Sequence, residues 1–102
     1  MPKILIVDDS NMLRDMVKYA LNEGGYPDVI EAVDGVDGLE KAKSNLFDLI
    51  VSDINMPNMN GFEMISELRK LPTYAKTPIL TLSPEGAKLS KEFFYKYFNA
   101  TD

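Results

Sequence analysis

The most informative part of the sequence is the stretch LIVSDINMPNMNG at residues 49–61. Its short apolar run, followed by turn-forming residues, is typical of a strand buried on both faces, as in a parallel sheet. Asp53 then comes at the carboxyl end of that strand, the edge at which open α/β sheets bind their ligands. A charge at the end of a buried strand is costly unless it is paired or bound to a metal. Asp53 is therefore a candidate functional residue, although a carboxylate that only caps the next loop would give the same pattern.

Composition limits the classes of protein and of site that are possible. The chain has 102 residues, 45% of them hydrophobic and 26% charged, which predicts one domain over residues 1–102 with a single core. Its net charge of −5 argues against nonspecific nucleic-acid binding. Because cysteine and histidine are both absent, a metal would have to be held by oxygen atoms. The sequence shows no signal-peptide or membrane-spanning pattern, so a cytoplasmic protein is expected.

Strand-like and helix-like patterns alternate along the chain. Buried strands are predicted at residues 4–7, 28–32, 49–53 and 79–83. Amphipathic helices are predicted between them, at about residues 13–21, 36–44 and 62–71. This alternation is typical of βαβ units with right-handed crossovers. The sequence therefore predicts a parallel sheet within a three-layer α/β/α fold. We take the strand order to be 2-1-3-4, which is a common order of doubly wound sheets.

The helical patterns also predict starts, stops and core-facing side chains. Asp9 or Ser10 can cap the first helix. Gly38 should weaken the second helix by up to about 1 kcal/mol, and Pro72 should stop the third. The apolar face predicted for the first helix comprises Leu13, Met16, Val17, Ala20 and Leu21, and that of the third comprises Phe62, Ile65, Leu68 and Leu71.

Residues 84–102 are the ambiguous part of the sequence. A helix over about residues 86–98 would gather their aromatic side chains on one broad face, but the run FFYKYF at 93–98 also has the composition of a strand. Only residues 84–92 separate this run from the fourth strand. A helical crossover between parallel strands needs about a dozen residues. A C-terminal helix is therefore favoured, with a hairpin as the alternative.

Three carboxylates are expected at one edge of the predicted sheet. Asp8 and Asp9 follow the first strand and Asp53 ends the third, and these two strands are neighbours in the order 2-1-3-4. Helix capping alone would also explain Asp8 and Asp9, but three adjacent carboxylates repel one another unless a cation such as Mg²⁺ neutralises them. One carboxylate could then accept a phosphoryl group as an aspartyl-phosphate. Ser83, at the end of the neighbouring fourth strand, could donate a hydrogen bond to that group.

Several motifs resemble the receiver domains of response regulators in two-component signalling. They are ILIVDDS at residues 4–10 with Arg14 downstream, DLIVSDINMPNMNGFE at 48–63 and TPILTLS at 77–83. Their spacing is most similar to that of single-domain, CheY-like chemotaxis receivers. The resemblance covers about residues 2–83 and implies the CheY-like, flavodoxin-like fold and the function of a phosphoacceptor receiver.

The resemblance also implies roles for individual residues. Asp53 would accept the phosphoryl group from a histidine kinase or a small acyl phosphate, and water would later remove it. Asp9 would bind Mg²⁺ directly, Asp8 mainly through water, and Asn55 through its backbone carbonyl. Ser83 would be the switch hydroxyl that moves toward the phosphoryl group. Catalysis would be limited to the protein's own phosphorylation and dephosphorylation.

The sequence departs from the family in its last part. Receivers usually continue with a fifth strand that ends in Lys-Pro, whose lysine contacts the phosphoryl oxygens, and with a fifth helix. No Lys-Pro pair occurs in this sequence, and Pro84 stands where a small residue is usual. Without a fifth strand the fourth would be an unpaired edge. A homodimer through that edge and residues 84–102 is therefore a possible partner arrangement.

Two other functions share parts of this pattern. An altered receiver that keeps the acidic pocket could act as a non-switching dimer or interaction module. A hydrolase of the haloacid-dehalogenase type also places an aspartyl nucleophile after a buried strand. That family requires Asp-x-Asp, however, whereas residues 53–55 read Asp-Ile-Asn. Stable phosphorylation would favour the phosphoacceptor, and hydrolysis of a phosphate monoester would favour the hydrolase.

Overall fold

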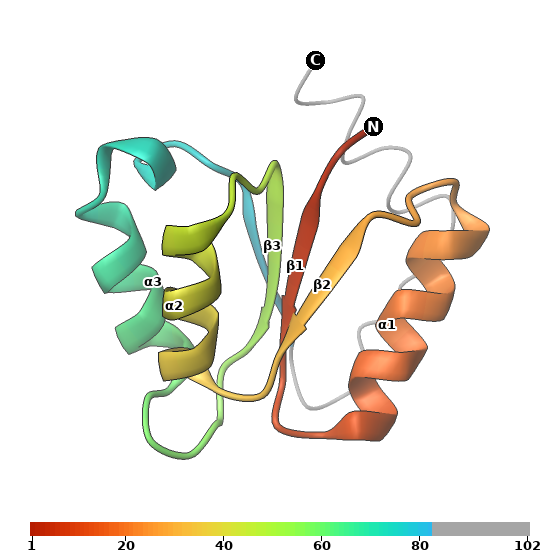
Figure 1. Ribbon diagram of the computed structural model, residues 1–102. Helices are drawn as coiled ribbons and strands as arrows, with labels where there is room; N and C mark the ends of the chain where they lie inside the picture. The colour runs from red at the N-terminus through yellow and green to blue at the C-terminus, as the bar shows by residue number, and fades with distance from the viewer. Residues whose placement is uncertain (83–102) are drawn as a thin grey trace.

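The computed structural model describes residues 1–82. In chain order, the elements within this range are β1 (Ile4–Val7), α1 (Asn11–Glu23), β2 (Val29–Ala32), α2 (Gly35–Ser44), β3 (Leu49–Asp53), α3 (Gly61–Arg69), a short 3₁₀ helix η1 (Pro72–Tyr74) and β4 (Ile79–Leu82) (Figure 1). The alternation predicted from the sequence is therefore confirmed. Ser83 and the predicted C-terminal helix lie outside the described residues.

The strands form a parallel sheet of order β2-β1-β3-β4, as predicted. Ile4 lies opposite Val29 on β2 and Leu49 on β3, so the strands start nearly level. On the other side of β3, Asp53 lies opposite Leu82 of β4. Because the register is level, the carboxyl ends of the strands meet at one edge of the sheet.

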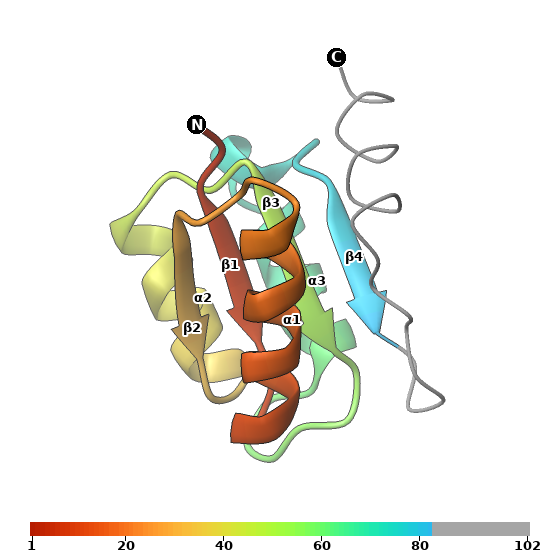
Figure 2. The ribbon, with the colours of Figure 1, turned by 90° about the vertical axis from the view of Figure 1, so that its right-hand side faces the viewer.

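The two faces of the sheet are covered by different helices. Figure 2 shows α1 in front of one face, with α2 and α3 behind the other. Successive side chains of a strand point to opposite faces, so each strand contributes to two cores. The core beneath α1 contains Ile4, Ile6, Val17, Leu21, Leu49, Val51 and Leu82. The core beneath α2 and α3 contains Leu5, Val7, Ala32, Ala42, Phe47, Ile50, Met64, Leu68 and Tyr74.

Two of the predicted helix faces are partly wrong. On α1 the buried residues are Arg14, Val17 and Leu21, whereas Met16 is 61% exposed. Predicted Leu13 is also exposed. On α3, Gly61, Met64 and Leu68 are buried, whereas Phe62 is 63% exposed. Apolar spacing indicates that a helix is amphipathic, but contacts elsewhere in the fold decide its rotation.

Side-chain caps fix where the helices begin. Ser10 caps α1, because its hydroxyl accepts a hydrogen bond of 3.2 Å from the backbone N–H of Leu13. This settles the choice between Asp9 and Ser10. Asn60 and Glu63 form a reciprocal capping box at the start of α3. The β3–α3 loop therefore ends at a defined residue.

Gly38 has a packing role as well as a cost. A Cβ atom at this position would lie 2.8 Å from the sulfur of Met64 on α3 and 3.0 Å from a methyl carbon of Val7 on β1. Glycine therefore allows α2 to lie close to both elements. The close packing is thus obtained at a position where glycine also has the lower helix propensity expected from the sequence.

Tyr74 ties η1 to the end of α2. The whole residue is 1% exposed, and its hydroxyl lies 2.6 Å from the carbonyl oxygens of both Ala42 and Asn45. Tyr74→Phe should lower the free energy of unfolding by about 1–3 kcal/mol, because the buried carbonyl of Ala42 and the partly buried carbonyl of Asn45 lose their donor. Urea denaturation measures this change. Tyr19→Phe is the matched control, since Tyr19 is 67% exposed. An equal effect of the two substitutions would contradict the assigned role of the Tyr74 hydroxyl.

None of the helices within residues 1–82 combines the length and apolar character that a membrane-spanning segment needs.

Candidate metal and phosphoryl site

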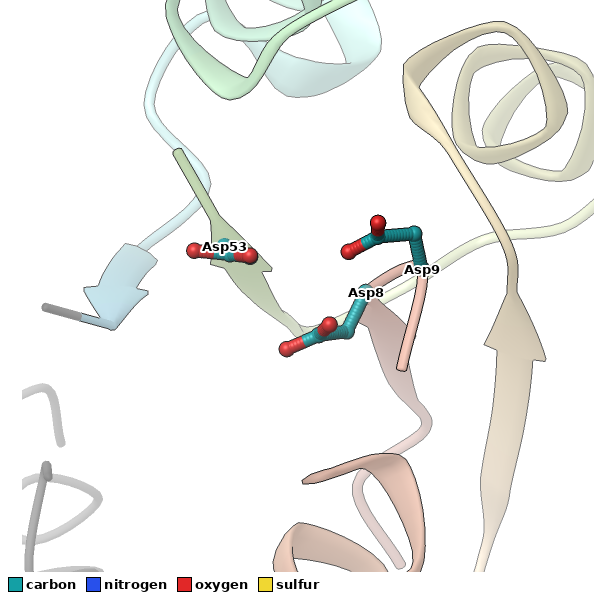
Figure 3. A group of neighbouring side chains, drawn as sticks. All are labelled: Asp8, Asp9 and Asp53. Atoms are coloured by element: carbon teal, nitrogen blue, oxygen red, sulfur yellow. The ribbon is translucent and has the colours of Figure 1, made fainter. Parts of the chain in front are cut away.

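Three carboxylates meet at the carboxyl edge of the sheet. Asp8 and Asp9 directly follow β1, and Asp53 is the last residue of the adjacent β3. One carboxylate oxygen from each residue lies within 4.8 Å of the others. Figure 3 shows the three side chains around a common space between the two strand ends. The structure thus brings together the three acids that the sequence placed at this edge.

Asp8 is the buried member of the group. Asp8 is 1% exposed, and its Oδ1 accepts a hydrogen bond of 2.9 Å from the backbone N–H of Ser10. Its Oδ2 is buried and has no hydrogen-bond partner among the described residues. Burial, together with the nearby charges of Asp53 and Asp9, raises the pKa of Asp8. A buried carboxylate oxygen without a donor is the atom that a hard divalent cation would satisfy, so the donor set fits Mg²⁺.

In the absence of a metal, the negative charge of Asp8 should therefore lower the stability of the folded protein. Because the pKa of Asp8 in the folded chain is raised above 3.8, the folded state holds its proton more tightly than the unfolded state. The resulting stabilisation is complete below the unfolded pKa and is lost as the pH rises through the folded pKa. In the variant Asp8→Asn the side chain at residue 8 is uncharged at every pH. The stability of this variant relative to the natural protein should therefore grow as the pH rises above 3.8. Urea denaturation in EDTA at several pH values measures this difference. A difference that does not vary with pH would contradict the assigned charge penalty.

Asp53 is half-buried and is oriented by its own loop. Its Oδ1 accepts a hydrogen bond of 2.7 Å from the backbone N–H of Ile54. The carbonyl of Ile54 in turn accepts a bond of 2.8 Å from the N–H of Gly61, which closes the loop at the start of α3. Asn55 lies exposed in this loop, two residues beyond Asp53. The arrangement holds one oxygen of Asp53 and leaves its carboxylate facing Asp8 and Asp9.

The same loop is fastened to α2. Asn58, whose φ of 68° is in the left-handed region, donates from its side-chain amide to the carboxylate of Asp34 at 2.8 Å. The N–H of Gly35 donates to the carbonyl of Met59 at 3.1 Å. Asp34 also caps α2 by accepting from the N–H of Asp37 at 2.8 Å. The loop that follows Asp53 is therefore held at both its middle and its end.

Sequence reasoning missed the contacts that support the site. Arg14 entered the prediction only as part of a family motif, yet its guanidinium donates to the backbone carbonyl of Asp8. A cationic residue in line with Val17 and Leu21 on the buried face of α1 was the available signal. The link between Asp34 and Asn58 had no comparable signal, because it joins loops that are far apart in the sequence.

Comparison with known proteins places this geometry in a family. Residues 4–98 match the family model of the response regulator receiver domain. The chemotaxis protein CheY1 of Helicobacter pylori is 38% identical over 87 residues, which cover 84% of this chain and 70% of that protein.

Solved structures agree with this match. The chemotaxis response regulator CheY4 of Vibrio cholerae superimposes with a TM-score of 0.80 and 36% identity, covering 98% of both chains. The receiver domain of the sensor histidine kinase PA1611 from Pseudomonas aeruginosa shares the fold, with a TM-score of 0.77 and 24% identity, over 85% of this chain and 70% of that one. The chain therefore belongs to the family of response regulator receiver domains, as a CheY-like receiver of the chemotaxis type.

Proposed function

We propose that this receiver domain is a phosphoacceptor switch in which Asp53 takes a phosphoryl group with the help of Mg²⁺. The observation that carries the proposal is the buried Oδ2 of Asp8, which has no hydrogen-bond partner within residues 1–82 and belongs to a group of three carboxylates. Receiver domains take phosphoryl groups from histidine kinases, and the family match supports the same donor here. A small acyl phosphate is a second proposed donor. A cytoplasmic location fits this function and stays a prediction.

The proposed metal ligands are oxygens of Asp8, Asp9 and Asp53, with the backbone carbonyl of Asn55. In the PA1611 receiver domain, which shares the fold, a magnesium ion is coordinated in the active site cleft. When bound, Mg²⁺ would offset the negative charge that carboxylate and phosphoryl oxygens bring together. Three acids within 4.8 Å would otherwise repel the incoming anion.

The chemistry of the chain itself is a transfer to Asp53. Because Oδ1 accepts a hydrogen bond from Ile54, we assign the attack to Oδ2. A bond forms between this oxygen and phosphorus, the bond from phosphorus to the donor breaks, and the donor leaves with the electron pair. Ser83 is proposed as the hydroxyl that contacts the transferred group. It lies outside the described residues, but it directly follows Leu82, which lies opposite Asp53 in the sheet.

The test is phosphoryl uptake by the full chain, measured by intact-mass spectrometry after incubation with acetyl phosphate. We expect one added phosphoryl group in the presence of Mg²⁺ and none when EDTA removes the metal. Calorimetry with MgCl₂ alone shows whether the metal site exists. Mg²⁺ binding without any adduct would contradict the phosphoacceptor proposal and favour the alternative of a non-switching interaction module.

The proposed homodimer is a separate prediction that sedimentation analysis tests.

A further inference from the structure

Arg14 makes three side-chain contacts from a buried position on α1. Its guanidinium donates to the backbone carbonyl of Asp8 and to the side-chain oxygen of Asn11. Its Nε donates to the carboxylate of Glu31 on β2 at 3.2 Å. The side chain therefore links the end of β1, the first turn of α1 and the neighbouring strand.

These contacts fix the backbone between the two acids that follow β1. The carbonyl of Asp8 belongs to the peptide that joins Asp8 to Asp9, so a donor on this oxygen restrains the orientation of both residues. The N–H of Ser10 restrains the same turn from the other side, through Oδ1 of Asp8. Arg14 thus acts on the carboxylates through the backbone.

Glu31 is the charged partner of Arg14. It accepts from Arg14 at 3.2 Å and from Lys18 at 3.1 Å. Lys18, and after it Arg14, holds the pKa of Glu31 below its ordinary value, so this carboxylate is ionised at neutral pH. An ionised partner on β2 holds the guanidinium in place, and the three contacts of Arg14 described above leave the carboxylate oxygens of Asp8 and Asp9 untouched.

We propose that Arg14 and Glu31 form a clasp that positions the Asp8–Asp9 turn and thereby sets the affinity for Mg²⁺. The inference rests on the metal site of the proposed function. Arg14 is a positioning residue, since its contact with Asp8 is to the backbone carbonyl. Outer-shell groups that orient metal ligands typically change metal affinity by about 10- to 100-fold when they are removed.

The charge of Arg14 and its positioning role predict opposite effects on Mg²⁺ affinity when the side chain is removed. Removing a cation near an anionic pocket should strengthen the binding of Mg²⁺ if only charge matters. Removing the clasp should weaken it, because the carboxylates lose their fixed orientation. Arg14→Lys keeps the charge but cannot span the contacts to Asp8, Asn11 and Glu31, so it isolates the effect of position. Arg14→Met removes both.

The experiment is calorimetric titration of MgCl₂ into the 102-residue chain and its variants, at constant ionic strength. Thermal unfolding in EDTA first establishes a temperature at which each variant is folded. We expect Arg14→Lys and Arg14→Met each to weaken Mg²⁺ binding by about tenfold. Lys18→Met is the matched control, because it removes another cation from Glu31 without touching the Asp8–Asp9 turn. It should leave the affinity within about twofold of the natural protein.

Each outcome decides the proposal. An unchanged affinity in folded Arg14→Lys, even with a lowered melting temperature, would show a merely structural role and overturn the clasp. Tighter binding by Arg14→Met would show that charge alone acts. If Arg14→Met does not fold, Arg14→Lys decides. If the natural protein itself does not bind Mg²⁺, the proposed metal site fails and the clasp fails with it, whereas normal binding by every variant overturns the clasp alone.

Discussion

Asp53→Asn should abolish phosphoryl uptake from acetyl phosphate in the presence of Mg²⁺. Asparagine has nearly the same shape as aspartate, but its neutral amide is a poor nucleophile, and the acidic group loses one of its three carboxylates. Removal of a covalent nucleophile typically lowers the rate by at least about 10³-fold. Intact-mass spectrometry should therefore detect no adduct in the time in which the natural protein is fully modified.

Asp48→Asn is the matched control for this substitution. Asp48 immediately precedes β3, and its carboxylate accepts a hydrogen bond of 2.8 Å from the backbone N–H of Lys3, at the opposite edge of the sheet. The two substitutions change the net charge equally. Uptake by Asp48→Asn should match that of the natural protein. A phosphoryl adduct that persists in Asp53→Asn would show that another residue is the acceptor.

Gly61→Ala should have the largest effect on stability among the substitutions considered. A Cβ atom at residue 61 would lie 2.3 Å from the backbone oxygen of Asp53 and 2.9 Å from the Cα of Ile54. Both are backbone atoms, so no side-chain rotation relieves the clash, and the loop beside Asp53 has to move. We expect a loss of about 3 kcal/mol in the free energy of unfolding, at the upper end for overpacking. Phosphoryl uptake should fall as well.

Gly24→Ala separates this clash from the general effect of replacing glycine. Gly24 ends α1 with ordinary helical angles, φ −79° and ψ −4°. A Cβ atom there would meet its nearest neighbours at 3.4 Å, an ordinary contact. The free energy of unfolding of Gly24→Ala should therefore stay within about 1 kcal/mol of that of the natural protein. Urea denaturation of both variants makes the comparison, and equal losses would contradict the role assigned to Gly61.

The sheet and the acidic group could be predicted because they depend on local patterns and on topology. Apolar runs located the strands, and helical spacing between them required parallel pairing. Once the order 2-1-3-4 was given, the residues that end β1 and β3 had to meet at one edge. Asp8, Asp9 and Asp53 therefore came together without any knowledge of their side-chain contacts.

The parts that the sequence could not predict depend on contacts between distant segments. The rotation of α1 buries Arg14 and exposes Met16. That rotation goes with the hydrogen bonds of Arg14 to Asp8 and Glu31, which join α1 to the residue after β1 and to β2. The cap on α1 was ambiguous for a related reason, because Asp9 and Ser10 are both suitable residues. In the structure Ser10 is the cap, whereas Asp9 belongs to the group of three carboxylates.

The most direct test of the central claim is to locate the phosphoryl group on the natural chain. Borohydride reduces an aspartyl-phosphate to homoserine, which peptide mass spectrometry assigns to a residue. After incubation with acetyl phosphate and Mg²⁺, reduction should give homoserine at residue 53. When EDTA is present during the incubation, no homoserine should form there. Homoserine at Asp8, Asp9 or any other aspartate, or its absence from a protein that binds Mg²⁺, would contradict the account.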